Sequence, residues 1–147
     1  MLERILLRAE ATCYCPVEGE DFLKSPDQAY FMMRELCNED EEPSCWAMAL
    51  TERNRIIGIL RIPNQHREGL PVGGKSFAKL ALLSNAQKLM VFHNHFSGDP
   101  KPSDWDNYLT TCLNQSLESV NVDLMDHMVL GSQRYYSYLL DGKLKKE

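Results

Sequence analysis

Residues 93–106 read His-Asn-His-Phe-Ser-Gly-Asp-Pro-Lys-Pro-Ser-Asp-Trp-Asp, which is two histidines two positions apart, then seven residues, then Ser-x-x-Asp. If residues 86–95 end a strand, both imidazoles point to one face, and the Gly- and Pro-rich turn after them brings Asp106 back toward that face. Imidazole nitrogens and carboxylate oxygens are zinc ligands, and three protein ligands with a fourth position open to water are typical of catalytic zinc sites. The stretch therefore predicts a zinc site held by His93, His95 and Asp106.

Each half of this pattern also has a purely structural explanation. A His-x-His pair arises easily on a strand, because alternate side chains share a face. Ser103 with Asp106 three residues later is typical of a helix start, where the serine caps the helix and the carboxylate complements its dipole. The loop at residues 97–102 joins the two halves by a tight reversal, and this connection favours a metal site over two unrelated features.

The hydrophobic pattern around this stretch predicts a mixed sheet flanked by helices. We expect strands over residues 2–15, 45–50, 56–62, 88–92, 122–130 and 134–140, and helices over 25–36, 77–84 and 103–120. Ser25-Pro26 supplies an N-cap followed by proline at the first helical position, and the polar residues 51–55 separate the two strands of a hairpin. This order of elements indicates an α+β fold.

Composition narrows the class of protein. With 147 residues, 44% apolar and 25% charged, the chain has the size and balance of one globular domain. The net charge of −5 and the lack of a basic stripe argue against a protein built mainly to grip nucleic acid. An odd number of cysteines, a start unlike a signal peptide and no apolar run of about 20 residues predict a soluble, cytoplasmic protein with no membrane contact.

Residues 93–106 resemble the JAMM motif of the JAB/MPN metallopeptidase-like domains, and more closely its RadC branch, which reads His-Asn-His-Pro-Ser-Gly before Pro-Ser-x-x-Asp. Residues 51–59 are similar to the family's Asn-Arg-hydrophobic hairpin, residues 82–92 to its Asn-Ala helix and strand, and residues 126–131 to its Asp-His-hydrophobic-Gly strand. The resemblance implies an α+β fold of the JAB/MPN type, a mixed sheet flanked by helices in a cytidine-deaminase-like three-layer architecture.

The same resemblance divides the chain into three parts. We predict an N-terminal strand extension packed on the domain at residues 1–24, a RadC-like JAB/MPN domain at residues 25–140, and a charged tail at residues 141–147.

The activity that the resemblance implies is that of a zinc-dependent hydrolase acting on a peptide or protein substrate. His93, His95 and Asp106 would hold Zn²⁺, and a hydroxide formed there would attack an amide or isopeptide bond. Ser103 would hydrogen-bond near the attacking water and the transition-state oxygen. In active JAMM enzymes a glutamate on an earlier strand takes the proton of the water and passes it to the leaving amine.

That glutamate is where the sequence departs from the family. In the RadC pattern it directly precedes the hydrophobic strand, but alignment of the hairpin places Pro43 or Ser44 there and leaves Glu42 one or two positions short. A one-residue slip turns a strand side chain to the other face, so Glu42 needs a bulge or a kink at Pro43 to serve. Glu42 is the predicted base, and Glu41 is the next candidate.

A second departure is Phe96, which stands where the family has proline and changes the stiffness and surface beside the metal. The two departures favour a second hypothesis, a non-catalytic MPN-like interaction module that binds a protein partner with or without the metal. A structure that places the carboxylates of Glu41, Glu42 and Glu52 out of reach of the metal would favour it. A third hypothesis, a DNA-associated repair factor or nuclease, comes from the family's label, and the acidic net charge argues against it.

Three further features have structural explanations as strong as functional ones. Cys13-Tyr14-Cys15 lacks metal-type spacing and is expected to place buried thiols on an edge strand. His66 is expected in a solvated loop. Asp126 or His127 is expected to satisfy a core hydrogen bond, with support of the metal ligands as the alternative.

Overall fold

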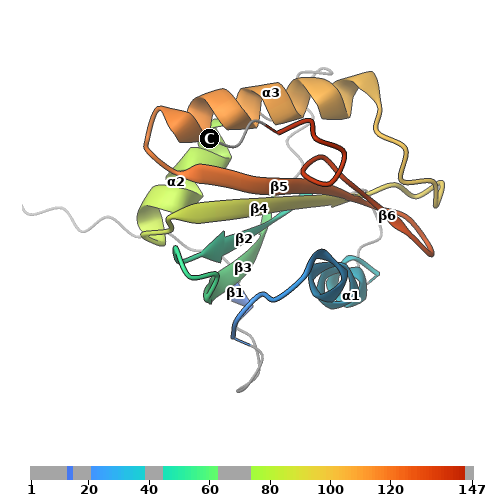
Figure 1. Cartoon of the computed structure of the whole chain (residues 1–147), viewed down its shortest axis with the longest axis horizontal. Helices are drawn as coiled ribbons and strands as arrows, with labels where there is room; N and C mark the ends of the chain where they lie inside the picture. Colours follow the sequence, from blue (N-terminus) through green and yellow to red (C-terminus); the bar gives the residue numbers. More distant parts are fainter. Residues whose placement is uncertain (1–12, 15–20, 39–44, 63–73, 145–147) are drawn as a thin grey trace, which may run out of the picture.

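The computed structural model describes residues 13–14, 21–38, 45–62 and 74–144 (Figure 1). Its strands are β1 (Cys13–Tyr14), β2 (Cys45–Leu50), β3 (Ile56–Ile62), β4 (Lys88–Asn94), β5 (Asp123–Leu130) and β6 (Tyr135–Ser137). Its helices are α1 (Pro26–Cys37), α2 (Lys75–Leu83) and α3 (Asp104–Glu118). The strands form one mixed sheet in the order β1-β3-β2-β4-β5-β6. This confirms the expected α+β fold, and the hairpin strands have the predicted bounds.

The sheet is the middle of three layers, with α2 and α3 on one face and α1 on the other. Strand β4 shows how one sequence serves both faces, because its side chains alternate between them. Leu89 and Val91 pack in the core under α2 and α3, whereas Met90 and Phe92 pack in the core over α1. The same alternation directs His93 toward α3.

Strand pairing fixes where a site is built. β4 pairs with β2 in antiparallel fashion, with Cys45 opposite His93, and it pairs with β5 in parallel fashion across the α3 crossover. The carboxyl ends of the two parallel strands therefore lie at the same edge of the sheet, together with the start of α3. Ligand sites of open α/β sheets favour such an edge.

The helix ends follow from local sequence. Ser25 caps α1 by accepting a hydrogen bond from the Gln28 N–H at 3.1 Å, as predicted. Asn85 and Asn121 follow α2 and α3 in the left-handed conformation, with φ of 54° and 58°. Asparagine tolerates this conformation, which ends the helix and turns the chain. Each turn leads directly into β4 or β5, so the two asparagines set where the parallel strands begin.

Strand β6 is shorter than the pattern at residues 134–140 predicts, and this prediction is wrong in extent. The carboxylate of Asp126 on β5 accepts hydrogen bonds from the Ser137 hydroxyl and from the Leu139 N–H, the latter at 3.0 Å. These bonds draw the chain into a turn after Ser137. At the other end of the chain, β1 lies at the sheet edge, but the remainder of residues 2–15 lies outside the described residues. The predicted extension at residues 1–24 stays a prediction, as does the predicted tail at residues 141–147, of which residues 145–147 lie outside the described residues.

The start of α2 touches α3 at Gly74, and we expect a methyl group there to be costly. A Cβ on Gly74 would lie 2.6 Å from the Ser116 Cβ and 3.1 Å from the Cys112 carbonyl oxygen. Gly74→Ala is expected to lower the free energy of unfolding by about 1–3 kcal/mol, measured by urea denaturation. The same change in a Ser116→Gly background should cost less. An equal cost in both backgrounds would contradict the contact as its cause.

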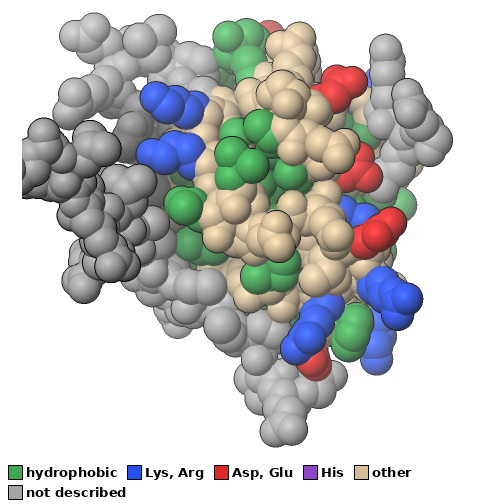
Figure 2. Space-filling view, turned by 90° about the vertical axis from the view of Figure 1, so that its left-hand side faces the viewer, with side chains coloured by type: hydrophobic (Ala, Val, Ile, Leu, Met, Phe, Trp, Pro, Cys, Tyr) green, Lys and Arg blue, Asp and Glu red, His purple; other side chains and the backbone are tan. Residues whose placement is uncertain are grey.

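One face of the molecule carries both apolar and charged side chains. Figure 2 shows hydrophobic side chains gathered on the face at the left of Figure 1, with both Lys or Arg and Asp or Glu side chains at their margins. The described part of this face carries both signs of charge.

Candidate metal centre

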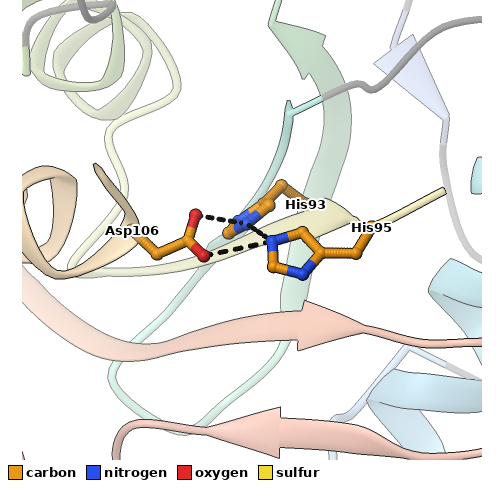
Figure 3. Close-up of side chains that lie close together, drawn as sticks. All are labelled: His93, His95 and Asp106. Atoms are coloured by element: carbon orange, nitrogen blue, oxygen red, sulfur yellow. Dashed lines mark hydrogen bonds and ion pairs between the residues drawn. The ribbon is translucent and has the colours of Figure 1, made fainter. Parts of the chain in front are cut away.

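The three predicted ligands meet at the edge where β4 ends and α3 begins (Figure 3). His93 is the last residue but one of β4, and His95 directly follows that strand. Asp106 is in the first turn of α3. Their side chains point toward one another: the Nε2 of His93 is 2.7 Å from Asp106 Oδ1, and the Nε2 of His95 is 3.0 Å from Asp106 Oδ2. The two Nε2 atoms are 3.1 Å apart. The structure thus brings together all three residues.

The loop after β4 is held in its reversal by the β5–β6 turn. Gly98 donates its N–H to the His95 carbonyl at 2.9 Å and has a φ of 82°, which glycine adopts without strain. The Gly98 carbonyl in turn accepts from the Ser132 N–H at 3.0 Å, and the His95 N–H donates to the Leu130 carbonyl at 3.0 Å. The position of His95 therefore depends on backbone contacts with the end of β5.

The carboxylate of Asp106 is oriented by a capping box. The Ser103 hydroxyl accepts from the Asp106 N–H at 3.2 Å, and the Ser103 N–H donates to Asp106 Oδ2 at 2.7 Å. This confirms the structural explanation of Ser-x-x-Asp, which therefore coexists with the metal-site geometry. Burial of Asp106 raises its pKa, but hydrogen bonds and charge attraction from His93, with hydrogen bonds from Ser103, outweigh burial and lower the pKa below the usual range. The carboxylate is ionised.

The hydrogen bond of His95 Nδ1 determines whether Nε2, the nitrogen that faces Asp106, carries a proton or a lone pair. Its Nδ1 is 3.0 Å from the Asp99 carbonyl oxygen, which only accepts hydrogen bonds, so Nδ1 carries a proton. In the neutral ring Nε2 then presents a lone pair to an ionised carboxylate, which is also an acceptor. A cation placed between them satisfies both, and metal-bound histidines commonly have a backbone carbonyl on the other nitrogen.

The triangle formed by the ligand atoms of His93, His95 and Asp106 also has a size that fits a metal ion. Bonds of 2.0–2.1 Å in a tetrahedral zinc site place ligand atoms about 3.3 Å apart. The ligand atoms of His93, His95 and Asp106 all lie within 4.8 Å of one another, and two imidazoles with a carboxylate suit a divalent ion of the zinc type. These residues therefore fit a metal ion.

One side of the triangle is open. The side chains of His93 and Asp106 are 9% and 2% exposed, whereas that of His95 is 22% exposed. The Trp105 ring meets the His93 ring edge-on, with centroids 6.2 Å apart. Phe96, next to His95, is 56% exposed, so the residue that replaces the family's proline adds an aromatic side chain to the surface.

The predicted base cannot be placed with the ligands. Glu41, Glu42, Pro43 and Ser44 lie outside the described residues, as does His66. Glu52 does not serve, because it follows β2 at the end where Leu50 pairs with Lys88, and Lys88 is about 17 Å of strand from His93. Its exclusion removes one of the three carboxylates considered for the role.

Two residues behind the ligands complete the centre. His127 is fully buried, with its Nε2 2.9 Å from the Nδ1 of His93, and burial followed by repulsion from His93 lowers its pKa well below the usual value. Its Nδ1 is 2.6 Å from the Thr110 hydroxyl. The sequence pointed to His127 as a core or supporting residue but missed Thr110, whose signal was its position one helical turn after Asp106.

Known proteins share most of this chain. A model of the RadC-like JAB domain matches residues 23–143. The chain belongs to this family. A UPF0758 protein of Stenotrophomonas maltophilia (strain K279a) is 38% identical over 98 residues, which are 67% of this chain and 42% of the relative. Another, from Desulforudis audaxviator (strain MP104C), is 28% identical over 127 residues, 86% of this chain and 55% of the relative.

The family match covers the three helices, the strands from β2 to β6 and the candidate metal centre together. A UPF0758 protein of Coprothermobacter proteolyticus is 36% identical over 102 residues, 69% of this chain and 43% of the relative. The chain spans about half the length of the curated relatives it matches. Within the described residues, the helices are too short or too polar to cross a membrane.

Proposed function

We propose that this RadC-like JAB domain is a zinc-dependent hydrolase of the JAMM metallopeptidase type that cleaves an amide or isopeptide bond in a peptide or protein. The observation that carries the proposal is the triangle of His93, His95 and Asp106 at the carboxyl edge of β4, with its three ligand atoms within 4.8 Å of one another. Cys37, Cys45 and Cys112 form no disulfide within the described residues, which accords with a reducing compartment, and we place the activity in the cytoplasm.

Different residues of the chain would bind the metal ion and the substrate. Zinc bound at such a site makes a water molecule more acidic and polarises a carbonyl group. His93, His95 and Asp106 would hold the ion, with Asp106 supplying one negative charge. Ser103 uses its hydroxyl oxygen as acceptor for the Asp106 N–H, and its own O–H proton is available to donate to a substrate oxygen. The exposed side of His95 is where substrate would enter.

We assign the role of general base to Glu42. β2 begins at Cys45, the residue paired with His93, so the chain reaches the sheet beside the metal ligands. In the sequence, Glu42 precedes Cys45, the first residue of this strand, by three positions. A base here would take a proton from water and deliver it to the leaving amine.

The second candidate function is a non-catalytic interaction module that still binds metal. It is favoured by Glu42 standing one or two positions short of the family's glutamate and by the exposed Phe96 beside the site. An exposed aromatic ring next to a buried polar centre suits contact with a protein partner.

Replacing Glu42 tests both functions at once. Zinc-loaded protein is incubated with a mixture of peptides and isopeptide-linked peptides, and products are identified by mass spectrometry. We expect Glu42→Gln to lower the cleavage rate by about 10²–10⁴-fold, because a proton acceptor is lost while the metal ligands are unchanged.

The neighbouring substitution Glu41→Gln is the matched control and should leave the rate unchanged. Equal rates for wild type and Glu42→Gln would show that the base is assigned wrongly. Full zinc occupancy without any cleavage would favour the interaction module, and failure of the wild type to take up zinc would refute the metal site.

A further inference from the structure

We infer that Thr110 and His127 are positioning residues that fix on which nitrogen His93 carries its proton, so that its Nε2 lone pair is available to a metal ion. The inference rests on the metal site proposed above but not on hydrolysis. It follows from a chain of hydrogen bonds that starts at the backbone of one ligand, Asp106, and ends on the ring of another, His93.

Thr110 determines which atoms donate and which accept along this series of hydrogen bonds. Its hydroxyl oxygen is 2.9 Å from the Asp106 carbonyl oxygen and 2.6 Å from His127 Nδ1. A carbonyl oxygen only accepts, so the single hydroxyl proton of Thr110 is donated to Asp106. The hydroxyl oxygen must then accept from His127, which places a proton on His127 Nδ1.

The protonation of His127 in turn determines which atom donates in its hydrogen bond with His93. The ring is fully buried, and its two nitrogens face Thr110 and His93 rather than a carboxylate, so the neutral form with a single proton is the one this environment favours. With that proton on Nδ1, the Nε2 of His127 accepts. The Nδ1 of His93, 2.9 Å away, is therefore the donor and keeps its proton, so Nε2, the nitrogen 2.7 Å from Asp106, is the one that gives up its proton when a metal ion binds.

Packing keeps the His127 ring in this orientation. The Tyr138 ring stacks on it with centroids 5.0 Å apart and planes inclined by 7°, and the Tyr138 hydroxyl donates to Asn107 on α3 at 2.7 Å. The hydrogen-bond chain thus joins α3, β5 and β4, the elements whose relative placement sets the distance between Asp106 and His93. Supporting contacts of this kind orient ligands and exclude the wrong protonation form.

The first test compares two substitutions of Thr110. Thr110→Val keeps the shape but removes the hydroxyl, whereas Thr110→Ser keeps the hydroxyl but removes a methyl group. We expect Thr110→Val to weaken zinc affinity by about 10–100-fold, measured by competition with a chelator, and Thr110→Ser to bind like the wild type. A role in packing alone predicts the reverse order, and that result would overturn the inference.

The second test reads the proton directly in metal-free protein. Nitrogen-15 NMR of the histidine side chains should show His127 protonated on Nδ1 in the wild type. In Thr110→Val the proton should move to Nε2, which forces the proton of His93 onto the nitrogen that the metal needs. Protonation of wild-type His127 on Nε2 would overturn the inference.

The two tests separate this inference from the proposed function. If the wild type binds no zinc, the proposed function fails, and the His127 spectra still decide the inference. If Thr110→Val binds zinc as tightly as the wild type, the inference fails and the metal site stands. Should Thr110→Val not fold, His127→Phe keeps a ring against Tyr138 but removes both nitrogens, and the same loss of zinc affinity is expected. Unchanged affinity in that variant would again refute the inference.

Discussion

Asp106→Asn is expected to weaken zinc binding by more than about 100-fold, since a direct ligand contributes more than the 10–100-fold typical of residues that only support ligands. The amide oxygen can still accept from the Ser103 N–H, so the helix start should survive. What is lost is the negative charge between His93 and His95, where a carboxylate oxygen lies within 3.0 Å of each Nε2. The dissociation constant, measured by competition with a chelator, checks this expectation.

The matched control is Asp104→Asn in the same first turn of α3. Asp104 carries the same charge at the same helix end, but its side chain is exposed and it is not among the three grouped ligands. Zinc affinity should therefore stay at the wild-type value. Equal losses in both variants would mean that zinc responds to the general charge of the helix start rather than to coordination by Asp106.

Local sequence signals predicted most of the elements that position the site. Serine before proline marked the start of α1, and the Ser103 capping box marked the start of α3, because both work through contacts within one helical turn. The His-x-His spacing was informative for the same reason. Although β4 ends at Asn94, before His95, both rings still reach Asp106.

What the sequence did not predict depends on contacts between distant segments. The early end of β6 follows from Asp126, which lies 11 positions before Ser137 and binds it across the sheet edge. The position of Thr110 one helical turn after Asp106 indicates a shared helix face, but only the fold places Thr110 against His127, 17 positions later. Such pairings leave no periodic trace in the sequence, so they are read from the structure alone.

The location of the centre also explains why it requires the whole fold. Two ligands come from β4 and its following loop, the third from α3, and the supporting histidine from β5. Each element has its own local reasons to form, but the distances between ligand atoms are set by how the elements pack. A substitution that shifts this packing should therefore affect the metal as well as stability.

Gly131→Ala is expected to weaken both metal binding and stability. A Cβ at Gly131 would lie 2.5 Å from the Gly98 carbonyl oxygen, 2.8 Å from the Arg134 carbonyl oxygen and 2.8 Å from the Pro100 Cδ, and none of these atoms belongs to a flexible side chain. The turn after β5 must therefore move away from the loop at residues 95–100. We expect a loss of about 1–3 kcal/mol in the free energy of unfolding, or roughly 3–10 °C in Tm by thermal denaturation.

Zinc affinity should fall in the same variant, because the His95 N–H is bonded to the Leu130 carbonyl and the Gly98 carbonyl to the Ser132 N–H. Gly142→Ala is the control: its φ of 69° makes alanine strained there, but no atom lies within 4 Å of the added Cβ. It should cost about 1–2 kcal/mol of stability and leave zinc affinity unchanged. If Gly131→Ala lowers Tm while zinc binds as in the wild type, the β5–β6 turn supports the fold but does not position His95.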